Sequence, residues 1–551
     1  MDTLENIETD RYHMYAKGLT LEVSDKVTLA SFLIELLEIQ NDDTSTLQED
    51  SEYDIERAIS EDTNLNENRS FKILWEALKE IKEITFVIEE YYVDRVYRDS
   101  YYTYYSCKHF CYNRYCKRLF MFFGKLSTKF NCDITCMPTR ELQKLFIGCM
   151  VIRPLNTGKI GRSLLNPYYF TEFDNTYVRY AIYDVTMFGK RLYVEAFPYS
   201  MQDEETTSCA EITILNLLDY FSKKYAEYKY FLPSEIINIA IRNGYERRLP
   251  TKGLDYLLIS KVFMEAGFYP VLYNSDKLED PSKFKRILHY YIESGIPIGI
   301  GLEINKNTKH SIVCIGHGKV DIRRIEKKQY SISNDKNYHI WLIDSSDMVS
   351  EYIVMDDNRK PYSRYEWKEG DSENPSLLDK WKPEYLMVPL YRRMFLEAAD
   401  AYDICTSILA DNALGIQRQI PNIGTIDNPV VIRLFMASAR GFKNHRIERF
   451  SDVNCDIRER YINTPFPRFV WVCELYLKSD YPKQCVGEII IDATAAANAK
   501  MGSVILLHYP NVVFQQLPDG ESLDHPIFYS LKSWEKFQGY KGNLHCPEKK
   551  Y

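Results

Sequence analysis

Several features are missing from this 551-residue sequence, and each absence excludes a class of protein. No run of apolar residues approaches the ~18 residues of a membrane-spanning helix, so we expect no membrane insertion. Basic residues do not exceed acidic ones, and the net charge of −9 argues against a general nucleic-acid binder. The first residues, Met1 to Glu5, are acidic and unlike an export signal. We therefore expect a cytoplasmic protein.

Signatures of metal and phosphate binding are also missing. Thirteen cysteines are scattered without the spacing of a disulfide framework, which predicts reduced thiols. Cys107, Cys111 and Cys116 lack the closely spaced pairs of structural zinc sites. Gly158 and Gly161 do not complete a phosphate-binding loop. We therefore expect no metal and no cofactor.

The chain is long enough for two to four domains, and its 45% hydrophobic content is that of a folded protein. The order of helical and strand patterns predicts an α+β protein of three parts. Residues 1–190 form an N-terminal α+β domain, residues 191–390 a middle domain, and residues 391–551 a helix followed by a β-rich domain.

Two segments of the N-terminal part have unusual composition. Residues 41–69 are acidic and polar, which is typical of an exposed loop or linker. Residues 91–118 combine many tyrosines with arginine and lysine. Aromatic and basic side chains together can bind single-stranded nucleic acid. We favour the simpler interpretation, a tyrosine-rich edge of the core, because the chain as a whole is acidic.

A cysteine at the predicted start of a helix is the first candidate for chemistry. From Cys209 onward, apolar residues follow the spacing of a buried helical face through Phe221. Ser208 and Glu211 have the spacing of a capping box, which makes Cys209 the first helical residue. The unpaired N–H groups and the helix dipole at this position favour a thiolate. Cys209 is therefore a candidate nucleophile.

Further along the chain lie residues that can complete a catalytic triad. After a mainly helical stretch, His310 begins a β-branched strand and Asp356 ends another. A histidine can take the thiol proton, and a carboxylate can fix its tautomer. Gln202 can donate its amide to an oxyanion. The sequence leaves alternatives open: His317 and His339 for the histidine, and Asp344 and Asp357 for the carboxylate.

Residues 200–365 resemble the papain-fold cysteine peptidases, and within them the bacteriocin-leader (double-glycine) peptidase-like branch. The resemblance rests on Gln202, the Ser208-Cys209-Ala210 helix start, the Gly295-Ile296-Pro297 strand entry, the His310 strand and Asp356. It implies a papain-like domain with Cys209 as nucleophile, His310 as base, Asp356 as orienting residue and Gln202 as oxyanion donor. The chain departs from that pattern in placing Gln202 seven residues before the cysteine, where six is usual. Residues 84–163 are also similar to uncharacterised bacterial proteins that carry such a domain.

These observations lead to three hypotheses. The first is a cysteine peptidase that cleaves a protein or peptide substrate through an acyl-thioester on Cys209. The second keeps the same residues but changes the reaction to that of an acyltransferase, transglutaminase or deamidase. The third is an inactive scaffold that binds a protein or nucleic acid through residues 91–118. The sequence does not determine the substrate or the oligomeric state.

Overall fold

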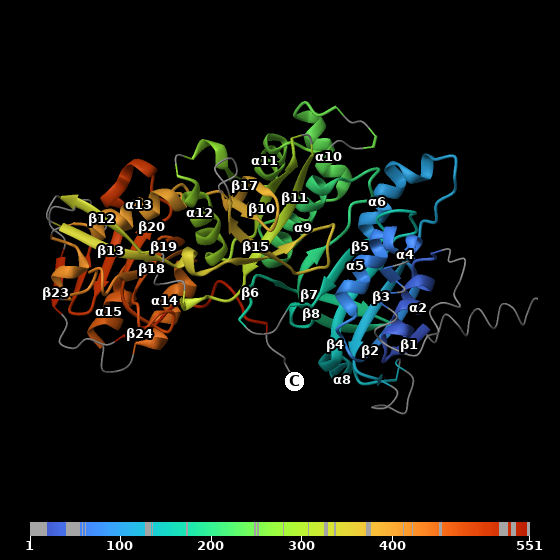
Figure 1. Cartoon of the computed structure of the whole chain (residues 1–551), viewed down its shortest axis with the longest axis horizontal. Coiled ribbons are helices and arrows are strands. Elements are labelled where there is room, and N and C mark those ends of the chain that lie inside the picture. The colour runs from blue at the N-terminus through green and yellow to red at the C-terminus, as the bar shows by residue number, and fades with distance from the viewer. Residues whose placement is uncertain are drawn as a thin grey trace, which may run out of the picture.

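The computed structural model contains three mainly antiparallel β-sheets that follow one another along the long axis of the molecule (Figure 1). The mixed α and β character expected from the sequence is confirmed. Residues described by the structure are 19–39, 56–57, 59–60, 62–126, 134, 136–171, 175–246, 249–250, 253–278, 280–306, 308–323, 329–335, 338–370, 376–411, 413–420, 422–450, 455–516, 527–530 and 536–547. Among these residues, no helix is long and apolar enough to cross a membrane.

The first sheet is built from the N-terminal third of the chain. Its strands, in spatial order, are β1 (Leu19–Val23), β2 (Ile84–Tyr92), β3 (Cys116–Phe123), β4 (Phe146–Ile152), β5 (Ile160–Leu165), β8 (Lys190–Tyr199) and β7 (Ala181–Met187). The accompanying helices are α2 (Lys26–Leu36), α4 (Thr63–Glu67), α5 (Arg69–Leu78), α6 (Arg95–Thr103) and α8 (Thr139–Leu145). The side chain of Asn68 accepts a hydrogen bond from the Phe71 backbone N–H and so fixes the start of α5.

The second sheet is preceded by helices. Its strands, in spatial order, are β16 (Ser376–Leu378), β15 (Ser363–Glu369), β14 (Glu351–Met355), β11 (Thr308–His317), β10 (Ile298–Asn305), β17 (Lys382–Tyr391) and β9 (Phe268–Asn274), and β6 (Tyr177–Val178) pairs with β11. The helices are α9 (Cys209–Lys224), α10 (Pro233–Arg242), α11 (Tyr256–Glu265) and α12 (Pro281–Glu293). Helix α9 packs against β7 and β8 of the first sheet and against β11 of the second, so it lies between the two sheets.

The third sheet takes most of its strands from the C-terminal part of the chain. In spatial order they are β12 (Gln329–Asp335), β13 (Tyr338–Asp344), β18 (Val430–Ser438), β19 (Phe469–Leu477), β20 (Gln484–Asp492), β21 (Val504–Tyr509), β22 (Val512–Gln515) and β23 (Ile527–Ser530), and β24 (Phe537–Gln538) pairs with β20. Its helices are α13 (Ala398–Leu409), α14 (Ala439–Arg449) and α15 (Cys455–Asn463).

The strand pair β12 and β13 lies in a different sheet from the strands that precede and follow it in the chain. The segment 339–344 comes between β11 and β14 in the chain, yet it does not join the second sheet. Strand β13 instead pairs in parallel with β18 of the third sheet, with Leu342 opposite Val430. An apolar β-branched run predicts a strand but not its partner, because the partner is chosen by long-range packing.

Other predicted boundaries can be placed on the observed elements. The boundary at residue 190 falls at the first residue of β8, which belongs to the first sheet, and the boundary at 390 falls within β17. Helix α4 and the start of α5 lie within the segment 41–69, for which a loop was expected. Residues 41–55 of that segment lie outside the described residues.

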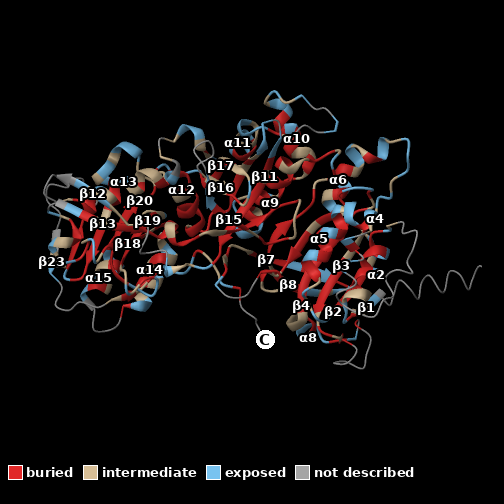
Figure 2. Ribbon diagram, viewed as in Figure 1, coloured by how far each residue is buried: buried red, intermediate tan, exposed pale blue. Residues whose placement is uncertain are grey.

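Buried residues form cores on both sides of the second sheet (Figure 2). Neighbouring residues of β11 enter different cores. Val313 and Ile315 belong to the core shared with α9 and the first sheet, whereas Ile312 and Cys314 belong to the core shared with α12 and the third sheet. This alternation follows the two-residue period of a strand. Strand β11 is therefore held from both faces.

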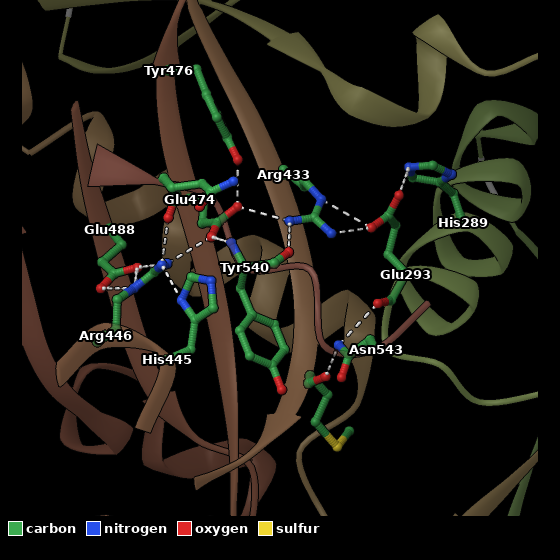
Figure 3. A network of polar contacts seen from close by, with 12 residues as sticks. His289, Glu293, Arg433, His445, Arg446, Glu474, Tyr476, Glu488, Tyr540 and Asn543 are labelled. Atoms are coloured by element: carbon green, nitrogen blue, oxygen red, sulfur yellow. Dashed lines mark hydrogen bonds and ion pairs between the residues drawn. The ribbon is translucent and has the colours of Figure 1, made fainter. Parts of the chain in front are cut away.

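A buried network of charged side chains connects the second and third sheets (Figure 3). Arg433 of β18 donates to Glu293 of α12 at 2.9 Å and to Glu474 of β19 at 2.8 Å. Arg446 of α14 donates to Glu474 and to Glu488 of β20, each at 2.6 Å. Buried charges are tolerated when partners surround them in this way.

Candidate active site

Cys209 is the first residue of α9, as its sequence context predicts. Ser208 is the N-cap residue, and the Glu211 carboxylate accepts a hydrogen bond from the Ser208 backbone N–H at 3.1 Å and another from its hydroxyl. This arrangement is the predicted capping box. Cys209 is partly exposed, whereas the helical residues from Ala210 to Phe221 are buried. The helix thus presents its thiol at an accessible end.

The loop before Cys209 is organised by the buried carboxylate of Asp203. Its Oδ1 accepts hydrogen bonds from the backbone N–H groups of Glu205, Thr206 and Thr207, at 3.1, 2.7 and 2.8 Å. Its Oδ2 accepts a bond from the Tyr105 hydroxyl at 3.0 Å. Backbone donors that converge on one carboxylate fix the loop conformation. The N-terminal domain therefore supports the loop that positions Cys209.

His310 and Asp356 come together because β11 and β14 are antiparallel neighbours. Val313 lies opposite Met355, so the start of β11 meets the end of β14. There His310 Nε2 lies 2.7 Å from Asp356 Oδ1, and both side chains are buried. The two residues, 46 positions apart in the chain, form a hydrogen-bonded pair.

The imidazole of His310 also interacts with Cys209. Burial by itself would lower the pKa of His310, but hydrogen bonds to the Asp356 carboxylate and to the Cys209 side chain outweigh burial and raise that pKa to about 10. Because Nε2 is bonded to Asp356, Nδ1 is the ring nitrogen left to share a proton with the thiol. His310 is thus bonded to a carboxylate and lies near enough to a thiol for both groups to raise its pKa.

Asp356 is held by further donors. The Tyr365 hydroxyl donates to Asp356 Oδ2, and the Asn358 backbone N–H donates to Oδ1 at 2.8 Å. Burial would raise the pKa of Asp356, but the hydrogen bond and the charge of His310 outweigh burial and hold that pKa below its usual range. Both oxygens of the Asp356 carboxylate therefore have hydrogen-bond partners.

Asn358 is a site residue that the sequence analysis missed. Its side-chain Nδ2 lies 3.1 Å from His310 Nε2 and 3.5 Å from Nδ1. Its Oδ1 is buried and has no hydrogen-bond partner among the described residues. The Val313–Met355 register, continued outward by three residues, places position 358 opposite His310. A sequence pattern gives no such register, although the spacing of Asp356 and Asn358 is that of an Asx turn.

Asp357 is a second carboxylate beside His310. It is 4% exposed, and its Oδ1 lies 3.6 Å from His310 Nε2. Neither oxygen makes a hydrogen bond of good geometry. Burial raises the pKa of Asp357 to about 6; His310 opposes this shift and the Asp356 charge adds to it. Asp357 therefore lacks the well-aligned hydrogen-bond donors that stabilise the Asp356 carboxylate.

His310, Asp356 and Asp357 are also the residues that could hold a metal ion. Among the described parts of the chain, theirs is the group of His, Cys, Asp and Glu side chains whose ligand atoms lie near enough to one another. His310 and Asp356 already bond to each other, which leaves Asp357 as the unengaged ligand. The expectation that the chain binds no metal stays a prediction.

Gln202 lies near the site, but its amide has no observed role. The Gln202 backbone N–H interacts with the Asp357 carboxylate and lowers its pKa. The backbone of Gln202 also packs on Gly158, where a Cβ atom would lie 2.1 Å from the Gln202 carbonyl oxygen. No hydrogen bond of the side-chain amide is found to any residue within the described ranges. The predicted oxyanion role of Gln202 stays a prediction.

Apart from Asp357, the alternatives left open by the sequence lie elsewhere. His317 is at the opposite end of β11, where its Nε2 lies 2.9 Å from Glu293 Oε1. His339 and Asp344 lie on β13 of the third sheet, and Asp344 accepts a hydrogen bond from Tyr290. Of the candidates, His310 and Asp356 are the pair that the structure brings to Cys209.

The tyrosine-rich segment 91–118 is mostly structural in its observed contacts. Tyr97 and Tyr105 are buried in a small core with Cys116. Tyr91, Tyr102 and Phe110 are exposed. The described cysteines are free thiols, and those of this segment form no metal-binding group with other described residues.

Comparison of the chain with known proteins finds no matching protein family, no similar curated protein and no similar solved structure.

Proposed function

We propose that this chain is a cysteine peptidase with a papain-like middle domain, in which Cys209, His310 and Asp356 form the catalytic triad. The observation that carries the proposal is the position of His310, bonded to Asp356 at 2.7 Å and near enough to Cys209 for the thiol to raise the pKa of the imidazole. In nucleophilic catalysis the thiol attacks the substrate, the imidazole accepts and returns the thiol proton, and the carboxylate orients the imidazole.

The first half of the reaction forms an acyl-enzyme. His310, held as an imidazolium by Asp356, stabilises a thiolate on Cys209, and this thiolate attacks the carbonyl carbon of the scissile peptide bond. The Cys209 backbone N–H is one of the unpaired donors at the start of α9 and stabilises the oxyanion. His310 then protonates the departing amine, and an acyl-thioester remains on Cys209.

The second half releases the product. His310, now neutral, takes a proton from a water molecule that attacks the thioester, and the thiolate leaves. Asp356 keeps Nε2 protonated throughout, so that Nδ1 remains the nitrogen that exchanges protons. Gln202 is the proposed second oxyanion donor.

A cleavage assay on a complex peptide mixture tests the proposal. The full-length protein is incubated with the mixture, and new peptide termini are identified by mass spectrometry. We expect cleavage by the parent protein and none by Cys209→Ala. Cys107→Ala is the matched control, since it removes an exposed thiol outside the site and leaves cleavage unchanged. Equal cleavage by Cys209→Ala would overturn the proposal.

The same experiment distinguishes hydrolysis from related reactions. Hydrolysis gives two shorter peptides, deamidation changes one peptide by a single mass unit, and acyl transfer gives a joined product. Retention of the folded state in Cys209→Ala is checked by the thermal unfolding midpoint, because a partly exposed thiol contributes little to the core.

A further inference from the structure

A pocket of about 390 Å³ adjoins the proposed site on the His310 side. It lies between α5 of the N-terminal domain and the segment 358–364 that follows β14. Asn358 forms part of its wall, and the same side chain lies 3.1 Å from His310 Nε2. The volume is within the range of pockets that bind small ligands or single side chains.

The wall of this pocket is predominantly cationic. The charged residues that line it are four bases and one acid: Lys72, Arg359, Lys360, Arg364 and Glu76. Both arginines already have carboxylate partners, Asp379 at 2.8 Å and Glu351 at 2.9 Å. The acid Glu76 accepts a bond from Lys79 at 2.9 Å.

The two lysines differ from the arginines in their ion pairing. Neither Lys72 nor Lys360 forms an ion pair with any carboxylate of the described residues. A concave site with two uncompensated positive charges attracts an anionic group. The pocket therefore carries an excess of positive charge that a bound carboxylate would neutralise.

The floor of the pocket is apolar and rigid. Ile73, Phe170 and Tyr362 line it and are buried. The Tyr362 hydroxyl donates to the Leu165 carbonyl at 2.7 Å, which fixes the ring between the first and second sheets. An apolar floor beneath a cationic rim suits the methylene groups and terminal carboxylate of a glutamate or aspartate side chain.

The place of the pocket relative to His310 indicates which part of a peptide it would hold. In the proposed reaction His310 protonates the departing amine, so the leaving-group half of the substrate lies on the His310 side of Cys209. Asn358 connects His310 directly to the pocket. We propose that this pocket binds an acidic side chain on the leaving-group side of the cleaved bond. This specificity rests on the proposed peptidase function.

Cleavage-site profiling with charge-reversed variants tests the proposal. The full-length parent, the double variant Lys72→Glu/Lys360→Glu and the double variant Lys261→Glu/Lys483→Glu are each incubated with the same peptide mixture. The last variant is the matched control, because it makes the same change in net charge at two exposed lysines that do not line the pocket. Mass spectrometry then gives the residues that follow each cleaved bond.

We expect Asp and Glu to be enriched on the leaving-group side for the parent and the control. In the Lys72→Glu/Lys360→Glu variant, kcat/KM for acidic peptides should fall at least tenfold relative to neutral peptides. Cleavage by the parent without acidic preference would overturn the specificity and leave the peptidase function standing. An equal loss of preference in the control would also overturn it, since the effect would then be one of net charge.

A binding measurement separates failure of the pocket from failure of the peptidase. Fluorescence polarisation follows a fluorescein-labelled hexaglutamate peptide on the Cys209→Ala protein, with and without the pocket variant. Binding that weakens at least tenfold in the pocket variant alone supports the pocket even if no peptide is cleaved. Equal binding to all variants, or displacement by a short oligouridylate at concentrations where unlabelled hexaglutamate fails, would overturn it.

Discussion

Strand β11 has a cluster of ionisable side chains at each end, and the two clusters differ in how completely their carboxylates are hydrogen-bonded. At its start, His310 contacts Asp356, Asp357 and Asn358 beside the partly exposed Cys209. At its end, His317 contacts Glu293, the first member of the buried network that continues through Arg433. A single strand thus connects an accessible cluster to an enclosed one.

The difference lies in the bonding of the carboxylates and in the access of solvent to the cluster. In the enclosed cluster, Glu293 is held by partners strongly enough that its pKa lies well below the usual range despite burial. In the accessible cluster, both oxygens of Asp357 and Oδ1 of Asn358 lack hydrogen bonds of good geometry to the described residues, and burial raises the pKa of Asp357. Satisfied buried charges hold sheets together, whereas unsatisfied groups beside a nucleophile are typical of chemistry.

The largest expected effect is on catalysis at the accessible end. Asp356→Asn keeps the shape of the side chain but removes the negative charge that orients His310 and stabilises its protonated form. We expect kcat/KM to fall about a thousandfold, by analogy with loss of the carboxylate in other triads. The unfolding midpoint should change far less than activity does. Activity within tenfold of the parent would show that Asp356 is not the orienting residue.

The pH dependence of the parent gives the same test a second measurement. With its pKa raised to about 10, His310 stays protonated through neutral pH, so its contribution to stability is complete below pH ~6.5 and is lost as pH rises through about 10. We expect kcat/KM to fall above pH 10 in the parent. In Asp356→Asn that fall should move toward neutral pH, as followed by rate profiles.

A comparably large effect on stability is expected at the enclosed cluster. Arg446→Met leaves Glu474 and Glu488 buried without this cation, which should destabilise the fold by about 3–5 kcal/mol. Arg468→Met is the matched control, because the Arg468–Glu227 pair is exposed and contributes below about 1 kcal/mol. Urea unfolding measures both. Equal small losses would mean that the buried network is not stabilising.

A smaller effect of opposite sign is expected for Asp357→Asn. The folded-state pKa of about 6 lies above the ~3.9 of an unfolded aspartate, so stability is highest below pH ~4 and falls as pH rises through 6. Asparagine does not ionise, so the variant avoids this loss of stability. The variant should exceed the parent in stability by about 3 kcal/mol above pH 7, since one pKa unit corresponds to about 1.4 kcal/mol. Thermal unfolding at pH 5 and pH 8 checks the sign, and a less stable variant at pH 8 would contradict it.

The smallest effect is expected where the N-terminal domain touches the Cys209 loop. Tyr105→Phe removes one of the bonds to Asp203 and should cost about 1 kcal/mol, with a several-fold loss of kcat. Tyr97→Phe removes a bond of similar length, 2.9 Å to the Asn113 carbonyl, away from that loop. It should lose similar stability and no kcat. An equal loss of kcat in both variants would show that the effect comes from general destabilisation and not from the bond between Tyr105 and the Cys209 loop.

Local features of the site could be predicted from the sequence, because they depend on near neighbours in the chain. Ser208 and Glu211 determine where α9 begins, and the predicted strand from His310 matches β11 within two residues at its start. Convergence of Cys209, His310 and Asp356 was expected from their residue types and the predicted elements that carry them, and the resemblance implied the same set. Their catalytic roles remain the proposal made above.

Features that depend on register and partner choice could not be predicted. Asn358 faces His310 only because β11 and β14 pair with Val313 opposite Met355. Likewise, β13 has the sequence of a strand, but its place beside β18 is set by the packing of the third sheet. Tyr105 reaches Asp203 across 98 positions of the chain, a contact that no local pattern contains.

Because β12 and β13 belong to the third sheet, the second and third sheets cannot be separated into independent fragments at one position of the chain. Leaving β11 after His317, the chain pairs with β18 and then returns as β14 to deliver Asp356. A fragment ending at residue 390 would leave the β13 edge bare and prone to aggregate. A fragment starting at 391 would lack two strands of its own sheet. Cutting the chain at 390 therefore does not yield two intact pieces. A pulling force on the third sheet would also be transmitted through β12 and β13 to β11 and β14, the two strands that carry His310 and Asp356.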